Sequence, residues 1–162
     1  MASWDMTSVY VRGIRRQALG RVGSLLKTCG VDIRKVVEIS FLRASSTLEV
    51  WTYDHERDGL VYSLRRAGLV VLEGMRPTDP SLLGTKAFLK LTPEQQQQSA
   101  AEHFVERLRR ITSLVDSNLR RCARRQFAAM LDEQKSALSV EATQEAAEPR
   151  NAHSRHRSCL CR

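Results

Sequence analysis

Near the start of the chain, Tyr10 and Arg12 alternate with two valines in the sequence Val-Tyr-Val-Arg. Successive side chains of a β-strand point to opposite faces, so both valines would face a core while Tyr10 and Arg12 share the other face. An aromatic ring can stack on a base and an arginine can contact a phosphate, which together suit single-stranded nucleic acid. The segment therefore predicts a strand whose outer face holds a nucleotide.

Other aromatic and basic residues extend this candidate surface. Trp51 and Tyr53 alternate in a second strand-like stretch, and arginines crowd a helical stretch in the second half of the chain. An arginine run on a helix leaves two interpretations open, a solvated face and an electrostatic arm for nucleic acid. The candidate nucleic-acid-binding residues are Tyr10, Arg12, Arg15, Arg16, Trp51, Tyr53, Arg120, Arg121, Arg124 and Arg125.

The sequence carries none of the short motifs that support catalysis. A glycine-rich phosphate loop, a Gly-x-Ser-x-Gly elbow and a His-Glu-x-x-His metal site are absent. His55 and His103 each have a carboxylate beside them in sequence, but neighbouring side chains on a helix point about 100° apart. We therefore expect a protein that is not an enzyme and that needs no cofactor.

The charge of the chain indicates its expected partner. Among 162 residues, 26 lysines and arginines outnumber 18 aspartates and glutamates, which gives a net charge of +8. RNA or single-stranded DNA is therefore the expected partner. No apolar run approaches the roughly 20 residues that span a bilayer, and residues 1–8 lack the apolar core of a signal peptide. We expect an intracellular protein, nuclear or cytoplasmic, with no membrane contact.

Residues 7–76 are predicted to form one domain in which strands and helices alternate. Apolar residues at three- and four-residue steps predict a helix over residues 17–29. A similar stripe predicts a second helix between Asp54 and Gly68. Residues 69–72 then form a last short strand.

Two further strands are expected between those helices. Val37, Ile39 and Phe41 alternate with polar residues, and residues 47–53 alternate again after a short polar turn. Strand, helix, strand, strand, helix, strand is the order of the ferredoxin-like fold, an α+β fold with two helices on one face of a four-stranded antiparallel sheet. The first and third strands are its central neighbours, so their aromatic residues would share the open sheet face.

Residues 9–14, Val-Tyr-Val-Arg-Gly-Ile, resemble the first-strand signature of the RNA-recognition-motif family, which is aliphatic-aromatic-aliphatic. That family carries stacking aromatics on its third strand, and here Trp51 could serve. Residues 9–74, with an Ile-Arg-Arg-Gln link and a Glu-Ile-Ser-Phe strand, also resemble the RNA-recognition-like segments of Gag-like proteins of fungal retrotransposons. The resemblance implies an RNA-binding sheet face on the coat protein of a mobile element.

A helical arm over residues 79–138 is predicted to follow. Asp79-Pro80 predicts a short helix, and Thr92 with Gln95 predicts a capping box that starts a long one. Along the long helix, apolar residues step by three and four as in a coiled coil, and an asparagine in such a seam fixes the oligomeric state. The alternative is that this stripe packs on the domain's own helices. The seam expected to form a homo-oligomer comprises Phe104, Leu108, Ile111, Val115 and Asn118.

Residues 139–162 lose this periodicity and are predicted to be a disordered basic tail. Within it, His153, His156, Cys159 and Cys161 offer ligand atoms that zinc accepts, but no hairpin-length spacer separates the ligand pairs. We therefore predict no metal site and leave open whether this cluster binds zinc.

These features predict non-enzymatic binding of single-stranded nucleic acid, RNA in the first instance, through an open sheet face and an arginine-rich helix. The alternative is a protein-interaction and oligomerisation scaffold that binds no nucleic acid. A pull-down from lysate with and without nuclease separates the two.

Overall fold

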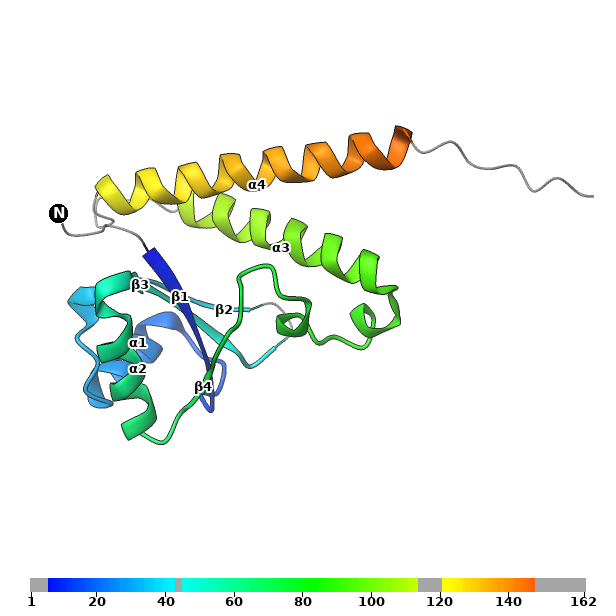
Figure 1. Ribbon diagram of the computed structural model, residues 1–162. Coiled ribbons are helices and arrows are strands. Elements are labelled where there is room, and N and C mark those ends of the chain that lie inside the picture. The colour runs from blue at the N-terminus through cyan, green and yellow to red at the C-terminus, as the bar shows by residue number, and fades with distance from the viewer. Residues whose placement is uncertain (1–5, 43–44, 114–120, 148–162) are drawn as a thin grey trace, which may run out of the picture.

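The protein has an α+β fold in which one four-stranded antiparallel sheet lies between two helical layers (Figure 1). The computed structural model describes residues 6–42, 45–113 and 121–147. The strands are β1 (Met6–Arg12), β2 (Val36–Phe41), β3 (Leu48–Tyr53) and β4 (Val70–Leu72). The α-helices are α1 (Leu19–Thr28), α2 (Arg57–Arg66), α3 (Pro93–Ser113) and α4 (Arg121–Ala147). Short 3-10 turns are η1 (Ile33–Lys35), η2 (Asp54–Glu56), η3 (Pro80–Leu82) and η4 (Phe88–Lys90).

The strands lie in the order β2-β3-β1-β4, and every neighbouring pair is antiparallel. The central pair is β1 with β3, as the sequence predicted, and its register sets Tyr10 opposite Glu49 and Ser8 opposite Trp51. Between β2 and β3 the register shifts by one residue at Val36 and Glu38, as at a β-bulge. The predicted alternation along β2 therefore holds only from Glu38 onward.

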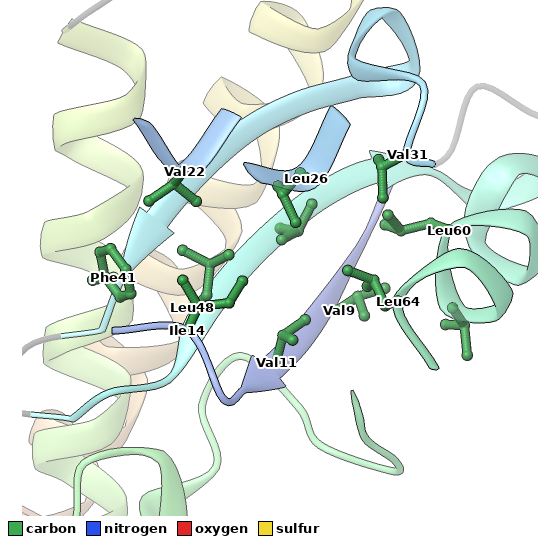
Figure 2. Packing of buried hydrophobic residues seen from close by; sticks show 12 residues of the cluster. Val9, Val11, Ile14, Val22, Leu26, Val31, Phe41, Leu48, Leu60 and Leu64 are labelled. Carbon is green, nitrogen blue, oxygen red and sulfur yellow. The ribbon is translucent and has the colours of Figure 1, made fainter. Parts of the chain in front are cut away.

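The first core lies between the sheet and the helices α1 and α2 (Figure 2). The valines of β1 point into it as predicted, and Val11 is fully buried. Two leucines, Leu26 of α1 and Leu64 of α2, are also fully buried there. Gly13 turns the chain at the end of β1 with a φ of 103°, where a Cβ would lie 3.3 Å from the side chain of Leu69. Glycine suits this position because other residues rarely adopt such a φ.

The opposite face of the sheet is covered, so the expectation of an open face is wrong. A second apolar cluster joins aromatic residues of β3 to the helices α3 and α4. Val37 of β2, which was expected to face the first core, packs against this second cluster because of the register shift. The fully or nearly buried members of the cluster are Met6, Trp51, Tyr53, Phe104, Leu108, Ile111, Ala123 and Phe127.

The helical arm differs from its prediction in length and in course. The capping box is confirmed, because Gln95 Oε1 accepts from the Thr92 amide at 3.1 Å and Thr92 Oγ1 accepts from the Gln95 amide at 3.3 Å. Instead of one long helix there are two, since α3 ends at Ser113 and α4 begins at Arg121. They pack side by side and run in opposite directions as a hairpin (Figure 1), here called the α3–α4 hairpin.

Helix α4 continues to Ala147, so the predicted loss of structure from residue 139 does not hold over residues 139–147. The short helix predicted at Asp79-Pro80 is the 3-10 turn η3, in which Asp79 Oδ1 accepts from the Ser81 amide at 2.9 Å. Within the described ranges, no helix has both the length and the apolar character needed to cross a membrane.

Candidate nucleic-acid interface

Three predicted nucleic-acid-binding residues, Tyr10 and Trp51 as base-stackers and Tyr53 beside them, lie on one face of β1 and β3 as expected, but they are buried there. Tyr10, Trp51 and Tyr53 are only 1%, 2% and 4% exposed. The ring of Trp51 lies nearly parallel to that of Phe104, with centroids 6.4 Å apart, and the edge-on ring of Phe127 lies 5.2 Å away. The chain's own aromatic rings therefore occupy the places where bases were expected to stack.

A polar network lies in the same layer and joins the sheet to α3. Glu49 is fully buried, and its carboxylate accepts from the Tyr10 hydroxyl at 2.9 Å and from the Ser40 hydroxyl at 3.4 Å. Arg107 of α3 faces that carboxylate, with Nη2 donating to Oε1 at 3.3 Å and Nε 3.3 Å from Oε2. Its Nη2 also donates to the Pro77 carbonyl at 2.8 Å. Such a pair satisfies two charges that would be costly to bury singly.

The network perturbs two titratable groups of the sheet. Burial, and after it the negative charge of Glu49, raises the pKa of Tyr10 far above its usual range, so its hydroxyl stays protonated and donates. Burial also raises the pKa of Glu38 on β2, against the opposing effect of the positive charge of Arg110. Burial on this face therefore disfavours the charged forms of both groups.

The predicted phosphate contacts on the first strand and its connection to α1 are exposed. Arg12, Arg15 and Arg16 are all open to solvent at the end of β1. The guanidinium of Arg12 donates to Thr47 Oγ1 at 3.4 Å, and that of Arg16 lies 5.8 Å from the centroid of the Phe41 ring. All three cations lie on the surface, where a phosphate chain could reach them.

The predicted basic residues of the arm lie at a separate place. Arg124 and Arg125 are exposed on the first turns of α4, which pack near Met6 at the other end of β1. Arg121 begins α4, and Arg120 lies outside the described residues. The structure thus does not bring the two predicted arginine groups together.

The predicted oligomerisation seam packs inward. Phe104, Leu108 and Ile111 are buried against the sheet, whereas Val115 and Asn118 lie outside the described residues. The three described side chains are therefore unavailable to a second copy while the hairpin is in place. The stripe therefore packs within the chain, as the alternative interpretation predicted. It packs against the sheet as well as against the helix α4.

One hollow of about 200 Å³ combines cations from distant parts of the chain. It opens between the β1–α1 connection, the end of β2, η3 and α3. Its lining comprises Arg16, Phe41, Leu83, His103, Glu106, Arg107 and Arg110. His103 and Arg110 were not among the predicted site residues, because the docking of α3 beside Arg16 is what brings these residues together.

A second hollow lies beside α2. There Tyr62 is 66% exposed between Arg57 and Arg65, but each arginine pairs with an acid, Asp58 and Glu73 respectively. Two of its three arginines are therefore balanced by acids, and Arg66 is the third.

The described part of the chain holds no group of three or more His, Cys, Asp or Glu residues suited to a metal ion. The cluster His153, His156, Cys159 and Cys161 lies outside the described residues.

Compared with protein-family models, with curated proteins and with solved structures, the chain matches none of them.

Proposed function

We propose that this protein binds single-stranded nucleic acid, RNA in the first instance, on the outside of the closed domain and without catalysing a reaction. The observation that supports this most is the exposure of Arg12, Arg15 and Arg16 together at the end of β1, beside the hollow that Arg110 lines from α3. Arginines of this kind neutralise phosphates whatever the base sequence. The net charge of +8 acts in the same direction.

The buried aromatics change the mode of binding that the sequence suggested. With Trp51 packed against Phe104 and Phe127, the sheet face offers no ring to a base while the α3–α4 hairpin is closed. Binding would then depend on phosphate contacts and would be strongly salt-dependent, with little preference among bases.

We also propose that the sheet with α1 and α2 belongs to the ferredoxin-like class and is related to the RNA-recognition-like segments of Gag-like proteins. The support is the order β2-β3-β1-β4, the antiparallel pairing of each neighbour, and a first core between α1, α2 and one face of the sheet. A coat protein of a mobile element would need the sequence-tolerant RNA binding proposed above.

The decisive experiment is a titration of a labelled single-stranded RNA, and of the same sequence as DNA, at several salt concentrations. For single strands, the slope of log K against log salt is about −0.7 for each phosphate neutralised. Replacing Arg15 or Arg124 with Gln should make the slope shallower by about 0.7 each. Absence of binding to either strand at about 50 mM salt would refute the proposal.

Arg34→Gln is the matched control. Arg34 is also an exposed arginine, but its Nε and Nη2 donate to the two carboxylate oxygens of Asp32 at 3.0 Å each. Its charge is therefore already balanced within the protein. Replacing it should leave the slope nearly unchanged, although the net charge falls by the same amount.

A protein-interaction scaffold is the second candidate, and one surface favours it. An apolar hollow of about 290 Å³ between η4 and α3 is lined by Phe88 and Leu91, and the neighbouring Leu89 is 66% exposed. Capture of a protein partner that survives nuclease treatment, together with a flat salt profile for RNA, would favour this second function.

A further inference from the structure

We infer that the hollow between the β1–α1 connection and α3 binds a phosphate group, held mainly by Arg16 and Arg110. This inference rests on the proposed function, because it names the point at which a phosphate of the bound strand would be held. The residues concerned come from segments that are far apart in the sequence and that meet at this hollow.

Charge makes the hollow suitable for an anion. Three arginines, Arg16, Arg107 and Arg110, line it against a single carboxylate, that of Glu106. That carboxylate lies 3.8 Å from Nδ1 of His103. Arg107 is already engaged by buried Glu49 and by the Pro77 carbonyl, so it forms the wall of the hollow and does not serve as the main ligand. The exposed guanidinium groups of Arg16 and Arg110 are the main ligands, and the charge of Arg110 also acts on the Glu38 carboxylate of β2.

The geometry of arginine favours phosphate over a halide or another small anion. A guanidinium presents a planar fork of donors that matches two oxygens of a phosphate, and two such groups lining one hollow can share a tetrahedral anion. Arg16 lies over the Phe41 ring at 5.8 Å, which restricts its orientation before a ligand arrives.

The size of the hollow limits what it can hold. A volume of about 200 Å³ is well above the roughly 10–15 Å³ that one water molecule needs and is enough for a phosphate group with some of its water. Pockets for drug-sized ligands start at about 300 Å³, so a whole nucleotide would not be enclosed. The sugar and base would lie outside.

The phosphate can come from the end of a strand or from its backbone, and the experiment separates these sources. Short RNA with a 5′-phosphate, the same RNA with a 5′-hydroxyl, and inorganic phosphate at constant ionic strength are titrated against the full chain and its variants. Loss of affinity confined to the 5′-phosphorylated RNA identifies a terminal phosphate. Equal loss for both strands identifies a backbone phosphodiester.

Arg110→Gln should weaken RNA binding about tenfold or more, because it removes hydrogen bonds to a charged group. Arg110→Lys keeps the charge but loses the fork, so it should restore only part of the affinity. The matched control is Arg109→Gln, because Arg109 is the exposed neighbour on α3 and does not line the hollow. Glu106→Gln should strengthen binding, since it removes the negative charge of the hollow.

The outcomes separate this inference from the proposed function. If Arg109→Gln and Arg110→Gln weaken RNA binding equally, the inference is overturned while the proposed function stands. If the chain binds no RNA but inorganic phosphate raises the melting temperature of the wild type and not of Arg110→Gln, the hollow is a phosphate site and the proposed function fails. If phosphate stabilises both chains equally and RNA does not bind, both fail.

Discussion

The guanidinium of Arg107 on α3 faces the carboxylate of Glu49 on β3, with Nε 3.3 Å from Oε2, in the layer between the sheet and the α3–α4 hairpin. Glu49 is fully buried and Arg107 is 9% exposed. The pair thus ties together the two parts that the sequence separates into a sheet domain and a helical arm. Because Glu49 is fully buried and Arg107 nearly so, each charge compensates the burial of the other.

Removing one member of this pair should strongly destabilise the protein. Arg107→Met leaves the Glu49 carboxylate buried without its cation, which costs about 3–5 kcal/mol of unfolding free energy. Adding Glu49→Gln to that variant removes the unpaired charge and should recover much of the loss. Urea unfolding of the two single variants and the double variant measures the coupling, with Arg34→Gln of the exposed pair as control. Additive losses would show that the two groups do not depend on each other.

Trp51 should behave as a core residue. Trp51→Ala removes a ring packed against Phe104 and Phe127 and should cost about 3–5 kcal/mol, while Trp51→Phe costs less. RNA affinity of the protein that remains folded should stay close to that of the wild type, because the ring does not reach the surface. Thermal melts and RNA titrations of the same samples test this. An unchanged melting temperature with lost RNA binding would instead mean that the hairpin opens and the sheet face receives bases.

The seam of α3 should stabilise the single chain and not a dimer. Leu108 is fully buried against the sheet, so Leu108→Ala should cost about 2–5 kcal/mol. The unfolding midpoint should not depend on protein concentration, since no subunit dissociates. Melts over a wide concentration range, with sedimentation velocity beside them, provide the measurement. An unfolding midpoint that rises with protein concentration would instead show that the seam forms an oligomer, as predicted from the sequence.

Glu38 should make the stability of the protein depend on pH. Burial raises its folded-state pKa above its unfolded value of about 4.3, so its favourable contribution is present below about pH 4 and is lost as pH rises through the folded-state pKa. Glu38→Gln should therefore raise the unfolding midpoint at pH 7, and this gain should vanish near pH 4. Glu133→Gln on the exposed surface of α4 changes the net charge equally and is the control. A gain of the same size at both pH values would show that the ionisation of Glu38 is not its cause.

The sequence by itself determined most of the first layer of the fold. The period of two in β1, the period near 3.6 in α1 and α2, and the capping box at Thr92 and Gln95 are local patterns, and local backbone geometry follows from them directly. The central pairing of β1 with β3 also followed, because the order of the elements restricts how strands can meet.

The tertiary structure decided what covers each apolar face. Periodicity shows that Phe104, Leu108 and Ile111 form an apolar stripe, but a second copy and a sheet face satisfy such a stripe equally well. The packing of Trp51 against residues of α3 and α4 shows that the sheet face covers this stripe. The packing of α4 back along α3 depends on the same long-range contacts, so a continuous helical pattern did not reveal it.

The candidate site likewise depends partly on local sequence and partly on tertiary packing. The sequence alone sufficed to predict the surface cations Arg12, Arg15 and Arg16. An arginine is usually exposed, and the strand pattern of β1 places these three at its end. The Glu49–Arg107 pair and the hollow between Arg16 and Arg110 could not, since their members are separated by dozens of residues and meet only through the docking of α3. Local sequence determines which face a side chain takes, and long-range packing determines which group it meets there.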